Sequence, residues 1–148
     1  MKVLMSVALV LTAGAALAET PPLPAAMQAL VDYTRTSCET QGGTFGLGPD
    51  AILSADLNGD GAMDFIYDGA GVSCSANANL MCSEIGCELN VMVGEDQHNF
   101  IVLGWSVEKL GDRMVLRTKQ SGLLLNKPQD GTYDLVFDNT QKAWVEVK

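Results

Sequence analysis

The most constraining feature of the sequence is a nine-residue stretch at positions 56–64. It reads Asp-Leu-Asn-Gly-Asp-Gly-Ala-Met-Asp, so oxygen-bearing side chains stand at its first, third, fifth and ninth places. Calcium takes roughly six to eight oxygen ligands, and this alternation turns three side chains toward one ion. Glycine at the sixth place permits the sharp, positive-φ bend around such an ion. The stretch therefore predicts a calcium site formed by Asp56, Asn58, Asp60, the backbone carbonyl of Ala62, and Asp64.

Short β-prone runs at 51–55 and 65–67 flank this stretch, so we expect it to join two strands. Leu57 is expected to point into the core and anchor the loop. The EF-hand pattern requires flanking helices and a glutamate at its twelfth place, which here is Tyr67. Residues 55–65 are more similar to the strand–loop–strand calcium sites of integrin-type FG-GAP and VCBS repeats. No repeat follows, so a propeller is not implied.

The alternative for this loop is a metal-free β-hairpin, because Asn-Gly and Asp-Gly are strong turn signals. Three carboxylates at 56, 60 and 64 would repel one another without a cation, which favours calcium. Its expected role is structural: the ion stiffens the hairpin and stabilises the fold by linkage. Magnesium fits less well because it prefers a smaller octahedral shell and retains water.

The first 18 residues have the pattern of a secretory signal peptide. Lys2 precedes an uncharged apolar run that ends in Ala-Leu-Ala at 16–18. A transmembrane anchor would need about 20 apolar residues, whereas Glu19 and the following prolines end this run earlier. We therefore expect a mature domain at 19–148, with a flexible lead-in at 19–24. It would have no membrane span and would lie in the periplasm or outside the cell.

Four cysteines lie in this expected mature part, and an even number in an exported chain indicates two disulfides. Cys82 and Cys87 enclose four residues that include Gly86, which favours a local bridge between them. Cys38 would then pair with Cys74. The other pairings remain open, as do a redox couple and a thiolate metal site, although no Cys-x-x-Cys occurs.

The hydrophobic pattern predicts an α+β fold with one N-terminal helix packed on a mainly antiparallel sheet, stabilised by disulfides. Apolar residues recur at helical spacing between Pro24 and about Ser37. Residues 69–86 are expected to form a long loop. Besides the two strands that flank residues 56–64, alternating residues predict strands at 87–93, 101–107, 113–118, 122–126, 132–138 and 142–147.

A second resemblance covers much of the expected mature chain. It rests on Pro-Asp-Ala-Ile at 49–52, the loop at 56–64, Asp-Phe-Ile-Tyr-Asp at 64–68, and the cysteines at 74, 82 and 87. These features look like small exported proteins common in alphaproteobacteria. The resemblance implies export, disulfides and a single compact domain, and it implies no particular activity.

Composition and single residues narrow the function classes. Eighteen acidic against nine basic residues give a net charge of −9, which argues against nucleic acid or anionic lipid as a partner. His98 is the only histidine, which excludes multi-histidine metal sites, and we expect it at the surface. We expect the remaining acids to be solvated, among them Glu84, Glu88, Glu95 and Asp96. The one loose group of basic residues is expected on the solvent-facing side of a strand; it consists of Lys109, Arg113, Arg117 and Lys119.

Three functions remain open at this point. The first is a non-catalytic, calcium-binding exported domain that binds a protein or an envelope component. The second is an acidic inhibitor of a basic enzyme such as a lysozyme or a protease. Removing residues 1–18 takes away one lysine and no acid, so the mature net charge of −10 would steer a basic partner. The third is a small secreted hydrolase that uses carboxylates or His98.

Overall fold

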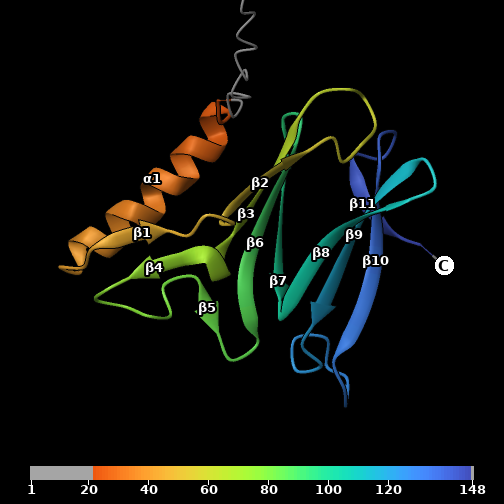
Figure 1. Ribbon diagram of the computed structural model, residues 1–148. Coiled ribbons are helices and arrows are strands. Elements are labelled where there is room, and N and C mark those ends of the chain that lie inside the picture. The colour runs from red at the N-terminus through yellow and green to blue at the C-terminus, as the bar shows by residue number, and fades with distance from the viewer. Residues whose placement is uncertain (1–21, 148) are drawn as a thin grey trace, which may run out of the picture.

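The computed structural model describes residues 22–147, which form one α-helix, one 3₁₀ turn and a series of antiparallel strands (Figure 1). The helix is α1 (Ala25–Thr40) and the 3₁₀ turn is η1 (Gly69–Gly71). The strands are β1 (Phe45–Leu47), β2 (Ile52–Ala55), β3 (Asp64–Asp68), β4 (Val72–Cys74), β5 (Cys82–Ser83), β6 (Gly86–Val93), β7 (Asp96–Val102), β8 (Gly104–Leu110), β9 (Arg113–Gln120), β10 (Gly131–Asp138) and β11 (Ala143–Glu146).

The elements are arranged in three layers. The first sheet has the order β2-β3-β6-β5, with β7 also paired to β6, and the second has the order β11-β10-β9-β8. Figure 1 shows α1 on one side of the first sheet and the second sheet on the other. A short ribbon of β1 and β4 lies beside the helix. The predicted α+β class is confirmed, with two main sheets in place of one.

Two apolar cores lie on the two faces of the first sheet. Successive side chains of a strand point to opposite faces, so Phe65 and Tyr67 of β3 face the helix while Ile66 faces the second sheet. The helix-side core also contains Met27 and Val31 of α1. The core between the sheets consists of Leu57, Ile66, Leu89, Val91, Val93, Val102, Leu116, Leu135 and Phe137. A strand that is covered on both faces has a continuous run of apolar residues, and Phe-Ile-Tyr at the centre of β3 is such a run.

Helix α1 forms where the apolar spacing predicts it. The residues at positions 27, 31, 34 and 38 are buried, and they recur every three to four residues along one face. Pro24 stands at the N-cap, where its missing N–H costs nothing. The helix ends at Thr40, three residues beyond the predicted end, and Gly42 then turns the chain with φ +77°.

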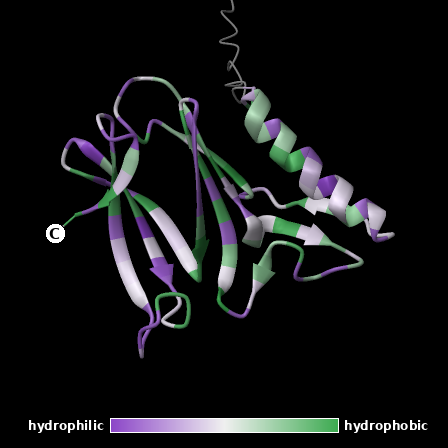
Figure 2. Ribbon diagram, turned by 180° about the vertical axis from the view of Figure 1, so that it is seen from behind, coloured by the Kyte–Doolittle hydropathy of each residue, from purple (hydrophilic) through white to green (hydrophobic). Residues whose placement is uncertain are grey.

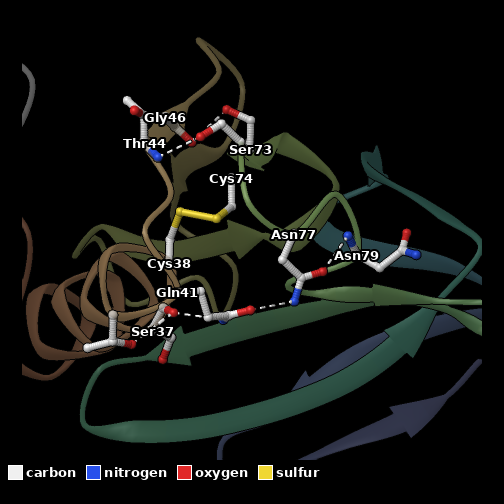
Figure 3. The surroundings of a disulfide bond; sticks show 11 residues. Ser37, Cys38, Gln41, Thr44, Gly46, Ser73, Cys74, Asn77 and Asn79 are labelled. Atoms are coloured by element: carbon white, nitrogen blue, oxygen red, sulfur yellow. Dashed lines mark hydrogen bonds between the residues drawn. A yellow bond between two sulfur atoms is a disulfide. The ribbon is translucent and has the colours of Figure 1, made fainter.

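Both predicted disulfides are present. Cys38–Cys74 joins the C-terminal end of α1 to β4 (Figure 3), and Cys82–Cys87 joins β5 to the start of β6. Near the first bridge, the Asn77 side-chain amide donates a hydrogen bond of 3.3 Å to Oε1 of Gln41. The loop expected at 69–86 is therefore partly ordered into η1, β4 and β5 and is fastened to the helix.

The single strand predicted at 101–107 is wrong, because the chain changes sheets there. β7 ends at Val102 in the first sheet and β8 begins at Gly104 in the second. Between them, the N–H of Leu103 donates a 2.7 Å hydrogen bond to the carbonyl of Lys119, and the Leu103 side chain is 41% exposed. The apolar alternation continues across this break, so the pattern alone does not reveal it.

The strand predicted at 122–126 is also wrong, because this segment is a turn. The carbonyl of Ser121 accepts from the N–H of Leu125, and that of Gly122 accepts from Lys127. A Cβ on Gly122 would lie 2.6 Å from the carbonyl oxygen of Gln129, so the chain folds back tightly here. Leu123 is 79% exposed, and Figure 2 shows hydrophobic colour on this segment after β9.

The expected signal peptide at 1–18 and the start of the lead-in lie outside the described residues. Residues 22–24 precede the helix without regular structure. Within residues 22–147, no helix has both the length and the apolar character needed to cross a membrane.

Candidate metal site

Residues 56–63 form the loop between β2 and β3, as the sequence predicts, and Asp64 is the first residue of β3. Figure 1 shows this loop leaning toward the turns of the second sheet. Leu57 is 3% exposed and belongs to the core between the sheets, which confirms its role as an anchor. The side-chain amide of Asn139, in the β10–β11 turn, donates a 3.0 Å hydrogen bond to the carbonyl of Asn58. The loop is therefore held at both its base and its outer side.

The carboxylate of Asp56 organises the outer part of the loop. Its Oδ1 accepts from the N–H groups of Gly59 (2.7 Å) and Asp60 (3.1 Å). Its Oδ2 accepts from the N–H of Gly61 (2.9 Å). Gly59 and Gly61 have φ angles of +77° and +87°, which glycine adopts without strain. The two glycines thus allow the backbone to curl around one carboxylate.

Asn58 and Asp60 extend this cluster. The Asn58 Oδ1 accepts from the N–H of Asp60 (3.0 Å), and its amide nitrogen donates to Oδ2 of Asp60 (2.9 Å). The N–H of Ala62 donates to Oδ1 of Asp60 (2.8 Å). This backbone hydrogen bond, followed by that from Asn58, lowers the pKa of Asp60 below its usual 3.8. Asp60 is therefore ionised at neutral pH.

Asp64 occupies a different environment, because it is only 1% exposed. Its Oδ2 accepts from the N–H of Leu57 (2.8 Å), and its Oδ1 accepts from the N–H of Gly94 (2.9 Å) in the β6–β7 turn. Burial raises the pKa of Asp64 above 3.8; the two backbone hydrogen bonds oppose this shift, and the charge of Asp60 adds to it. Asp64 makes no ion pair with any residue in the range 22–147.

The structure thus brings Asp56, Asn58 and Asp60 into one hydrogen-bonded cluster and places Asp64 on the inner side of the same loop. Among residues 22–147, no three or more His, Cys, Asp and Glu side chains are grouped closely enough to hold a metal ion. A carboxylate offers about four lone pairs, and these contacts use three on Asp56 and two each on Asp60 and Asp64. The cluster retains oxygen ligands of the kind that a hard cation takes.

Sequence reasoning missed two contributors to this loop. Gly94 supplies an N–H to the buried carboxylate and Asn139 supplies an amide to the outer turn. Both come from turns distant in the sequence, and no local pattern marks them.

No family model matches the chain, and neither a curated protein nor a solved structure is significantly similar to it.

The expectation that His98 is a surface residue holds only in part, because the residue is half-buried. His98 lies on β7, and its ring meets that of Phe137 edge-on at a centroid distance of 5.5 Å. Its Nε2 is buried and has no hydrogen-bond partner among the described residues. The second sheet covers this side of β7, and a strand pattern does not show which strands another sheet will cover.

The charged residues outside the loop are mostly at the surface or in ion pairs. Arg117 donates to both oxygens of Asp134 and both of Glu108, at 2.7 to 2.9 Å. The Arg117 guanidinium holds the pKa of Asp134 below its usual value. Lys119 forms an ion pair with Asp130, and Asp96 forms one with Lys142. These pairs are consistent with solvated strand faces.

Proposed function

We propose that this chain is an exported, non-catalytic domain in which the loop at 56–64 binds Ca²⁺. The observation that carries the proposal is the buried carboxylate of Asp64, which lies near the charge of Asp60 and makes no ion pair with a described residue. An ionised carboxylate in such a place is costly without a compensating positive charge. A cation bound at the loop supplies that charge.

The ligands would be the side-chain oxygens of Asp56, Asn58, Asp60 and Asp64, with the carbonyl of Ala62. Because backbone N–H groups already hold the carboxylates, the side chains must shift to converge on one ion. That rearrangement costs free energy and is consistent with a dissociation constant in the range of extracellular modules, roughly 0.1 to 1 mM.

The calcium ion would have a structural role. The loop contacts Gly94 of the β6–β7 turn and Asn139 of the β10–β11 turn, so an ion that stiffens it also holds two other turns in place. Export is supported by the signal-like residues 1–18 and by the two disulfides, which persist in oxidising compartments. We propose that the folded domain acts by binding a protein or an envelope component.

Thermal unfolding of the oxidised protein in EDTA and in calcium tests the proposal. For a dissociation constant of about 0.1 mM, about 2 mM calcium adds about 1.8 kcal/mol by linkage. This corresponds to a rise in Tm of several degrees for a domain of this size. The substitution Asp60→Asn removes the charge but keeps an oxygen for the Ala62 N–H, so the variant is expected to fold and to lose the shift.

The matched control is Asp50→Asn, which makes the same chemical change at an exposed position before β2. It is expected to keep the calcium shift, as is Glu84→Ala at the β5–β6 turn. If calcium produces no shift, or if magnesium produces an equal one, the loop is a metal-free turn and the proposal is wrong.

A further inference from the structure

A cavity of about 470 Å³ lies between the proposed calcium loop and the second sheet. Residues 56–59 of the loop form one wall. The opposite wall comes from the β8–β9 turn and its neighbours, including Lys109, Asp112 and Arg113. Figure 1 shows the β2–β3 loop and the β8–β9 turn at the same end of the molecule. One side of the loop thus faces a cavity that borders the second sheet.

Two unpaired basic side chains line this cavity. Residues 22–147 contain seven Lys and Arg residues. Five of them have partners: Arg117, Lys119 and Lys142 form ion pairs, Lys127 bonds to the Tyr133 hydroxyl, and Arg35 lies over the Phe45 ring. The remaining two, Lys109 and Arg113, form no ion pair or side-chain hydrogen bond with a described residue, and both are among the residues that line this cavity.

The β8–β9 hairpin places these two residues on either side of its turn. Lys109 pairs in register with Met114, and Leu110 pairs with Arg113, so the cations lie on adjacent rungs beside the turn. Gly111 at the turn has φ +63°, which allows this tight reversal. A pair of unpaired cations in a chain with twice as many acids as bases is an anchor for an anionic group.

The remaining lining residues suit a small organic molecule. Met114, Val136 and Phe137 supply apolar surface, and Asn139 supplies an amide at the rim. The volume falls within the range of small-molecule pockets, roughly 300 to 1,000 Å³. The lining therefore combines two cations, Lys109 and Arg113, and two carboxylates, Asp56 and Asp112, with a short apolar wall.

We propose that this cavity binds a small organic anion, with its carboxylate or phosphate group held by Lys109 and Arg113. Asp56 lines the facing wall and would repel such a ligand in the absence of a metal ion. Calcium in the loop neutralises most of the negative charge of Asp56, Asp60 and Asp64, so the ligand is repelled less and binds more tightly when calcium is present. This calcium dependence rests on the function proposed above, whereas the cationic anchor does not.

The test uses two probes, succinate and glycerol 3-phosphate, titrated into the ¹⁵N-labelled oxidised protein in calcium and in EDTA. Saturable amide shift changes are expected at residues 109–114 and at Asn139, with at least about tenfold tighter binding in calcium. Arg113→Gln and Lys109→Gln are each expected to weaken binding about tenfold, the usual size for a lost charge-assisted contact. The probe that binds more tightly shows whether the site takes a carboxylate or a phosphate group.

The matched control is Lys119→Gln, which makes the same charge change at the other end of β9, outside this cavity. The inference is wrong if neither probe shifts the amides at 109–114, or if Lys119→Gln weakens binding as much as Arg113→Gln. Equal affinity in calcium and in EDTA would uphold the anchor and exclude the calcium contribution. A calcium-induced rise in Tm without probe binding would overturn this inference and leave the proposed calcium site intact.

Discussion

The indole Nε1 of Trp105 donates a 2.8 Å hydrogen bond to Oδ2 of Asp68 and thereby connects the two main sheets. Trp105 lies on β8 of the second sheet, and Asp68 ends β3 of the first. The other oxygen of Asp68 accepts from the N–H of Ala70 and so caps the 3₁₀ turn that follows. One carboxylate thus fixes both the contact between the sheets and the path of the chain after β3.

The two tryptophans provide a matched pair of substitutions at this interface. Trp105→Phe removes the donor to Asp68, and losing a hydrogen bond to a charged group costs about 1.5 to 3 kcal/mol. Trp144→Phe removes a buried Nε1 that has no partner among the described residues. Removing this unsatisfied donor partly offsets the free energy lost with the indole volume. Urea unfolding is expected to show a clearly larger loss for Trp105→Phe. Equal losses would show that the hydrogen bond adds nothing beyond packing.

The two disulfides are expected to stabilise the fold unequally. Cys38 and Cys74 are 36 residues apart, whereas Cys82 and Cys87 are five apart. Loop-closure entropy in the unfolded chain then predicts losses of about 4 and about 2 kcal/mol when each pair is replaced by alanine. Urea unfolding of the two double variants measures the difference. A smaller loss for the 38/74 pair would contradict the entropic account.

The raised pKa of Asp64 predicts that calcium binding is coupled to the release of a proton from this carboxyl group. Without calcium, the folded state holds this proton more tightly than the unfolded chain does. The contribution of Asp64 to the free energy of unfolding is therefore present below pH 3.8 and is lost as the pH rises through the raised pKa. Calcium requires the ionised carboxylate, so its affinity falls as the pH drops through the same range.

Calorimetric titration of calcium in buffers of different ionisation enthalpy measures this linkage. Proton release per calcium is expected to increase as the pH is lowered from neutral toward the raised pKa of Asp64. Asp60 contributes less to this release than Asp64 because its pKa is lowered. Asp50→Asn is expected to leave the release unchanged, whereas Asp64→Asn removes it together with most of the affinity. Calcium binding whose proton release does not increase as the pH is lowered would show that Asp64 is not a ligand.

Local patterns in the sequence were sufficient for several elements. The spacing of apolar residues predicted α1, because a helix buries one stripe every three to four residues regardless of what covers it. The oxygen pattern and the two glycines predicted the loop at 56–64 and its anchor Leu57. The short spacing of Cys82 and Cys87 predicted both disulfides, since a local bridge leaves a single partner for Cys38.

Other features depend on which segments meet in space. The sequence by itself determined the helix, the strand-flanked loop and the local Cys82–Cys87 bridge, because each follows from the spacing of neighbouring residues. Only the tertiary structure decided that the chain changes sheets at Leu103, that Nε2 of His98 is buried, and that the N–H of Gly94 donates to the buried Asp64. It also decided that Lys109 and Arg113 share a cavity with the loop. Sheet membership, burial and electrostatic partners arise from contacts between distant segments, and a periodic pattern carries no record of those contacts.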